Sequence, residues 1–281
     1  MLKIAYRLGK ILNIYTLGLF NLAIILFAEF FGNGVFFYKS NLIHLIGIIF
    51  PVFILIFLFS QYLIFDATLR KALSFFLGAF VLSGLIHTII HILEIVKNLL
   101  APESIRISMQ MIYIISFLLI IIAAEIPWSV YTKKFHIGVL NYIALIAILF
   151  ILTVFALVNI NFSLLIKNSL ASKVLVAMLV GFGLLAIYEI RKKIKYILPL
   201  IFGKFSNFII AGIGVNIISG LFEFFALKNP LILGLIQNLY ISHFLFYIGS
   251  SFLILAFVNL LNLPGMYQDI RALIEKEEFK P

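Results

Sequence analysis

Two histidines and a glutamate share one face of a long apolar segment. His87, His91 and Glu94, called the histidine stripe below, stand among Ile, Leu and Val in GLIHTIIHILEIVKN. Because each residue of an α-helix turns by about 100°, His91 lies about 40° and Glu94 roughly 20° from His87. Imidazole nitrogens and carboxylate oxygens in this arrangement suit Zn, Fe or Mn. The spacing predicts a divalent-metal site here, with His44 or Glu29 completing the ligand set.

A histidine in the last apolar segment allows other chemistry. On a helix, His87 lies about 15 Å and His243 about 18 Å from the outer ends of their segments, at 1.5 Å per residue. This matched depth near a membrane midplane fits the two axial ligands of a haem b. A proton or cation path along the stripe, helped by Glu29 and Glu223, is a third interpretation. The structural alternative is a set of neutral histidines that hydrogen-bond to neighbouring helices.

The elements that must position these residues follow from composition. The chain has 281 residues, of which 64% are hydrophobic and 11% are charged. Soluble domains are about 45–50% apolar and about 25% charged, so the excess indicates lipid rather than water as the solvent. A bilayer-spanning helix needs about 20 mainly apolar residues. The composition therefore predicts an all-α integral membrane protein.

Charges and turn residues divide the chain into apolar segments, which predict a bundle of about eight transmembrane helices. The segments are 11–31, 41–65, 72–97, 109–127, 137–160, 173–190, 205–227 and 231–263. Connections on one side hold 15 basic residues, and those on the other side hold six. The positive-inside rule then places both termini in the cytoplasm (N-in and C-in), in what we expect to be a prokaryotic inner (plasma) membrane.

The organisation is a transmembrane domain, 1–263, followed by a short amphipathic tail, 264–281. Pro264-Gly265 ends the last apolar segment, and apolar residues recur at helical spacing after it. We expect the tail to lie on the lipid surface or to dock a cytoplasmic or membrane protein partner.

The net charge of +10 is distributed between the apolar segments. Basic residues in such positions contact anionic lipid headgroups at the inner face, and no aromatic-rich basic patch predicts nucleic-acid binding. We expect the run 191–204, RKKIKYILPLIFGK, to make such headgroup contacts. The chain has no cysteine, which excludes disulfides and thiolate ligands.

Two further features concern the helices themselves. Glu125 and Glu189 lie near the inner ends of their segments, where they could reach water or line the interior. We expect no lysine or arginine deep enough to neutralise Glu94, Glu29 and Glu223 along the histidine stripe. The glycine motifs GFGLLA, 181–186, and AGIGVNIISG, 211–220, predict close helix packing rather than a dinucleotide site, with Asn216 as an interhelical hydrogen-bond donor.

The sequence leaves three classes of function open. The first expectation is a non-enzymatic membrane sensor or ligand-binding module, with the His/Glu cluster in its outer half. The alternative is a small secondary transporter or channel subunit for a cation, metal or proton. The third is a haem- or metal-binding oxidoreductase subunit. No H-E-x-x-H, P-loop or G-x-S-x-G string points to a hydrolytic or nucleotide-binding enzyme.

Overall fold

A computed structural model describes the helical body of the chain. The described residues are 11–13, 15–20, 22–23, 67–97, 102–132, 138–159, 170–194, 199–226, 229, 231 and 241–261. Within these ranges there is no strand. The helices with assigned bounds are α5 (Ala67–Lys97), α6 (Pro102–Thr132), α7 (Gly138–Val158), α9 (Leu170–Glu189), the π-helix η2 (Ile190–Ile194), α11 (Pro199–Ala226) and α13 (Ile241–Leu261), and residues 15–20 are also helical. The all-helical prediction is confirmed for this part of the protein.

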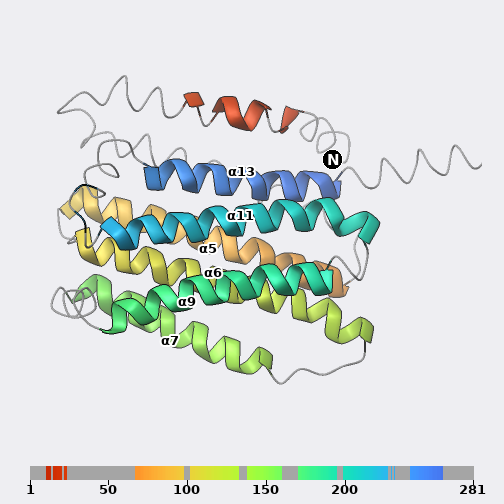
Figure 1. Ribbon diagram of the computed structural model, residues 1–281, viewed down its shortest axis with the longest axis horizontal. Coiled ribbons are helices and arrows are strands. Elements are labelled where there is room, and N and C mark those ends of the chain that lie inside the picture. Colours follow the sequence, from red (N-terminus) through yellow and green to blue (C-terminus); the bar gives the residue numbers. More distant parts are fainter. Residues whose placement is uncertain are drawn as a thin grey trace, which may run out of the picture.

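The helices lie side by side as an elongated antiparallel bundle (Figure 1). The chain runs up one helix and down the next, so the start of α5, the end of α6, η2 and the end of α13 gather at one end of the bundle. We call this the η2 end. Exposed basic side chains at the η2 end are Arg70, Lys71, Arg191, Lys192 and Lys204.

Three helices are long and apolar enough to cross a membrane, by length and composition. They contain the stretches Gln110–Val130, Leu170–Ile194 and Gly203–Phe222. Two shorter apolar stretches, Asn141–Phe155 and Tyr247–Asn259, lie on α7 and α13. The predicted segments from 72–97 to 205–227 each coincide with one helix, and α13 falls inside 231–263. Most of 11–31 and all of 41–65 lie outside the described residues, so eight spans remain a prediction.

Helix α6 forms the centre of the bundle. Of its apolar stretch, 83% is buried within the protein, because α5, α7, α9 and α11 all pack around it. A helix that is apolar on every face is expected in such a position. Polar contacts link α6 to its neighbours: the Ser116 hydroxyl donates to the carbonyl of Ala79 on α5 at 2.9 Å, and the Tyr113 and Ser219 hydroxyls lie 3.1 Å apart.

Glycines permit the closest helix contacts, as the glycine motifs predict. A Cβ on Gly183 would lie 2.5 Å from the Ile217 side chain, and a Cβ on Gly212 would lie 2.9 Å from Leu253. Gly181 differs from the prediction, because it is exposed and a Cβ there would meet nothing within 4 Å. The first glycine of GFGLLA therefore lies on the outside of α9 and the second lies on the inside.

The outer face of α9 is an apolar stripe with a basic residue at each end. Between Lys173 and Arg191 its exposed residues recur every three or four positions: Val174, Ala177, Gly181, Leu184 and Tyr188; Leu170 and Ala171, before Lys173, are exposed as well. Exposed Lys173 and Arg191 bound this exposed stripe, and they are about 27 Å apart along the axis at 1.5 Å per residue. That length is close to the roughly 30 Å hydrocarbon core of a bilayer.

Candidate functional site

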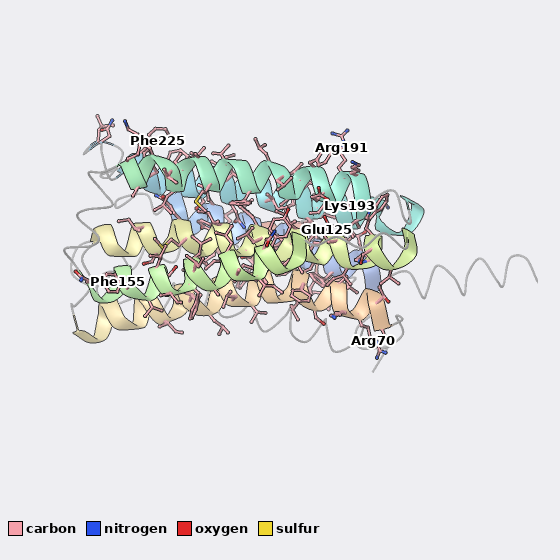
Figure 2. The ribbon with its side chains drawn as sticks, turned by 90° about the horizontal axis from the view of Figure 1, so that it is seen from below. Arg70, Glu125, Phe155, Arg191, Lys193 and Phe225 are labelled. Atoms are coloured by element: carbon pink, nitrogen blue, oxygen red, sulfur yellow. The ribbon has the colours of Figure 1, made fainter. Side chains whose placement is uncertain are left out.

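Three charged side chains are buried together at the η2 end. Glu125 of α6, Glu189 at the last position of α9 and Lys193 of η2 are 7%, 9% and 6% exposed, respectively. The Lys193 ammonium donates a hydrogen bond to Glu125 Oε1 and forms an ion pair with Glu189 Oε2. Figure 2 shows Glu125 and Lys193 directed toward each other, whereas Arg191 points away from the bundle. We call these three residues the charged cluster.

Local helix geometry sets two of the three positions. Glu189 and Lys193 are four residues apart, which places them on the same face one turn apart. Lys193 lies within η2, whose π-helical turn departs from regular α-helix. Such turns are rare and occur frequently at functional sites.

The third position is beside a proline. Pro127 lies inside α6, two residues after Glu125. Proline has no backbone N–H, so the carbonyl of Ala123 loses its usual partner in the helix, and the ring favours a kink. Each side of the Glu125–Lys193 ion pair is therefore next to an irregular turn, where a helix bends more easily than elsewhere.

The charges of the cluster do not balance. Two carboxylates face one ammonium, so the fully ionised cluster has a formal charge of −1. Glu125 Oε2 is buried and has no hydrogen-bond partner, and Glu189 Oε2 reaches the ammonium without the geometry of a hydrogen bond. An uncompensated buried charge costs several kcal/mol. Uptake of one proton, or of one small cation, removes this cost.

The available oxygen atoms favour a proton over a divalent metal. Ca²⁺ takes 6–8 oxygen ligands and Mg²⁺ requires a near-octahedral shell, whereas a proton needs one carboxylate oxygen. In the described ranges, no group of three or more His, Asp or Glu side chains could hold a metal ion. The cluster therefore has the chemistry of a proton acceptor.

A tyrosine from the neighbouring helix completes the surroundings. Tyr142 of α7 is partly exposed and interacts electrostatically with Glu125, Glu189 and Lys193. Its hydroxyl can both donate and accept a hydrogen bond. The charged cluster is thus bordered by a group that is itself open to the outside of the bundle.

The residues predicted from sequence are distributed over several elements. His87, His91 and Glu94 lie on consecutive turns of α5, Glu223 lies on α11 and His243 lies on α13. The side chains of these five residues are outside the described part of the structure, as are Glu29 and His44 entirely. The metal and haem interpretations therefore remain predictions.

The sequence prediction for Lys193 is wrong. We expected the run 191–204 to contact headgroups, but Lys193 turns inward and pairs with Glu125 and Glu189. Arg191 and Lys192 are exposed as expected. The spacing of Glu189 and Lys193 was the available signal, because oppositely charged residues four apart on a helix attract each other.

Comparison with known proteins gives no relative. No protein-family model matches the sequence, and no curated protein or solved structure matches it either. Function must therefore be inferred from the geometry of the chain itself.

Proposed function

We propose that the chain is a multi-pass membrane protein that binds a proton at the charged cluster and couples this binding to transport. The class is a small secondary transporter for a cation or proton. One observation carries the proposal: two buried carboxylates share a single ammonium, and one oxygen of Glu125 has no partner. A buried charge without full compensation is costly, which makes such a cluster a functional candidate.

Insertion in a membrane is supported by several independent features. The composition is strongly apolar, three helices are long enough to cross a bilayer, and the exposed stripe of α9 has the length of a hydrocarbon core. The exposed basic residues of the η2 end favour its placement in the cytoplasm, next to anionic headgroups. This orientation agrees with the N-in and C-in arrangement expected in a prokaryotic inner membrane.

Orientation is tested by labelling one introduced cysteine, since the chain has none of its own. Lys192→Cys is exposed at the η2 end and should react with an impermeant maleimide only after the cells are opened. Ile194→Cys, in the same turn, is the matched buried control and should react poorly in both cases. Labelling of Lys192→Cys in intact cells would show that the η2 end faces outward and would overturn the proposed orientation.

A proton at Glu125 would change the link between two helices. With Glu125 ionised, Lys193 is held between α6 and the end of α9. With Glu125 protonated, Lys193 and Glu189 balance each other within one turn, and the bond across to α6 weakens. A ligand shifts a conformational equilibrium only if its affinity differs between the two states. The proton meets this condition, because it binds more favourably to the state in which the α6–η2 link is weakened. The irregular turns at Pro127 and η2 are where the helices would bend.

Infrared spectroscopy tests proton binding directly. The full-length protein in lipid nanodiscs should show a carbonyl band of a protonated carboxyl group that grows on acidification. Glu125→Gln should remove this band. Glu189→Gln leaves one carboxylate for one ammonium, so Glu125 should stay ionised to lower pH and its band should appear only on stronger acidification. A wild-type protein without a Glu125-dependent band would end the proposal.

The sensor and redox interpretations depend on the histidine stripe. They remain predictions, together with a haem b or metal cofactor and a protein partner for the C-terminal tail. A visible absorption spectrum and a metal analysis of the purified protein test the cofactor. Replacement of His87, described below, tests the stripe itself.

A further inference from the structure

The proton of the charged cluster needs a route to water. Glu125 is 7% exposed, and its free oxygen is fully enclosed. A buried proton acceptor exchanges protons with water through groups that can both donate and accept a hydrogen bond, such as hydroxyls or bound water. The residues that face Glu125 from each neighbouring helix decide which group does so.

The helical register places Tyr142 on the α7 face that meets Glu125. The Thr153 hydroxyl of α7 lies 3.3 Å from the Met111 sulfur of α6, which fixes the two facing sides. Glu125 follows Met111 by 14 positions, so around the axis of α6 its direction differs from that of Met111 by about 40°. Tyr142 precedes Thr153 by 11 positions, so around the axis of α7 its direction differs from that of Thr153 by about 20°.

The depths agree as well. Along the antiparallel pair, Glu125 lies about 21 Å from Met111 and Tyr142 lies about 17 Å from Thr153, toward the same end, at 1.5 Å per residue. The two side chains are therefore within one helical turn of the same level. This register is independent of the electrostatic interaction between Tyr142 and the cluster, and it leads to the same pairing.

The other titratable groups near Glu125 are already committed or turned outward. From α9 and η2, Glu189 and Lys193 face it and are paired with each other. Lys192 is exposed and donates to the Tyr188 hydroxyl at 3.0 Å. The basic residues at this end of α5 and α11, which are Arg70, Lys71 and Lys204, are exposed. Tyr142, by contrast, is a partly exposed hydroxyl that interacts electrostatically with Glu125.

We propose that the Tyr142 hydroxyl relays protons between the membrane–water boundary at the η2 end and Glu125 Oε2. The phenol donates its own proton to the carboxylate and accepts another from a hydronium ion at the surface, which leaves as water, so the hydroxyl is restored and charge is conserved. Tyr142 is thus a positioning and relay residue, and Glu125 is the acceptor. This inference rests on the proposed function.

A pH-jump experiment separates the rate of proton transfer from its equilibrium. The full-length protein in nanodiscs is acidified rapidly, and the Glu125-dependent infrared band is followed in time. Tyr142→Phe keeps the ring and removes the hydroxyl, so the band should grow at least about tenfold more slowly and reach the same amplitude at the same midpoint pH. Tyr188→Phe, which removes a hydroxyl from the exposed stripe, is the matched control and should behave as wild type.

Each result decides between the proposals. A wild-type rate in Tyr142→Phe overturns the relay and leaves the proton site intact. A shifted midpoint with an unchanged rate also overturns it, because Tyr142 would then only tune the cluster. If the wild-type protein shows no Glu125-dependent band, the proposed function fails first and the relay fails with it. Tyr142→His supplies another proton-carrying group and should restore part of the lost rate.

Discussion

Two clusters at the same end of the bundle hold helices together by different means. Phe205 of α11 packs edge-to-face against Phe76 of α5 and Phe257 of α13, with ring centroids 5.4 and 5.7 Å apart. This aromatic cluster contains no titratable group, so acidification leaves it unchanged. The charged cluster joins α6 to η2 through ion pairs that do depend on protonation. One side of the bundle is therefore fixed by packing, and the other can respond to a proton.

The same contrast holds along the helices. Gly212 brings α11 close to Leu253 of α13, and Asn216 lies against Gly249 of α13, in a closely packed apolar contact. Around Glu125, by comparison, two irregular turns interrupt the helices. Closely packed interiors have few alternative arrangements, whereas kinked helices can have two. We expect α11 and α13 to act as the static part and α9 to move against α6.

Replacement of Lys193 should give the largest effect. Lys193→Met leaves two carboxylates buried without a counter-charge, which should lower the free energy of unfolding by about 3–5 kcal/mol at neutral pH. The loss should shrink on acidification, because protonated carboxyl groups need no counter-charge. Thermal unfolding in detergent at two pH values measures both effects.

Lys192→Met is the matched control for this substitution. It removes the same charge from the neighbouring position, where the side chain is exposed, and should leave the unfolding midpoint unchanged. Equal effects at positions 192 and 193 would mean that the inward ion pairs contribute nothing to stability.

Replacement of Phe205 tests the static side. Phe205→Ala removes both edge-to-face contacts and leaves a cavity, which should lower the free energy of unfolding by about 2–4 kcal/mol. This is toward the low end for buried aromatic rings, because lipid is itself apolar. In contrast to Lys193→Met, this loss should be the same at both pH values. Phe225→Ala is the control, since its ring is 49% exposed. A pH-dependent loss in Phe205→Ala would remove the distinction between the two clusters.

The two glycines of α9 give a smaller and more local test. Gly183→Ala should destabilise the protein by about 1–2 kcal/mol, because the added methyl group would overlap the Ile217 side chain. Gly181→Ala has open space and should be neutral or stabilising by up to about 1 kcal/mol, since alanine favours the helix. Chemical denaturation of both variants in one detergent measures the difference. Similar values for the two would contradict the inward orientation of Gly183.

Replacement of His87 should have the smallest effect on stability. His87→Leu should leave the yield of folded protein unchanged or higher, because leucine is favoured at lipid depth. If the histidine stripe binds a metal, haem or proton, the same variant should lose the corresponding spectral, metal or flux signal. Full signal at normal yield would end the hypothesis of a site on the stripe.

Sequence reasoning located the helices well for a simple reason. Long apolar runs end where charges or turn residues interrupt them, so the segments 72–97, 109–127, 137–160, 173–190 and 205–227 each predicted one helix. The register within each helix was much harder to predict. When nearly every face is apolar, the periodicity that distinguishes inside from outside becomes weak.

The charged cluster shows which information the sequence alone does not supply. Arg191, Lys192 and Lys193 are consecutive basic residues with no difference in composition that marks one as buried. Which of them turns inward depends on the π-helical turn and on Glu125, which lies 68 residues earlier in the chain. Pairing over that distance requires knowledge of which helices are neighbours, and a single sequence does not contain it.

If the protein spans a bilayer as proposed, the exposed stripe of α9 would also make it sensitive to bilayer thickness. Its length of about 27 Å is a few Å less than the average hydrocarbon core, and tilting the helix shortens the span further. In a thicker membrane the mismatch would draw Lys173 and Arg191 inward, or thin the lipid around them, at a cost of fractions of a kcal/mol per Å. Arg191 belongs to η2, the turn that also holds Lys193. Acyl-chain length would therefore exert tension on the same turn that a proton releases.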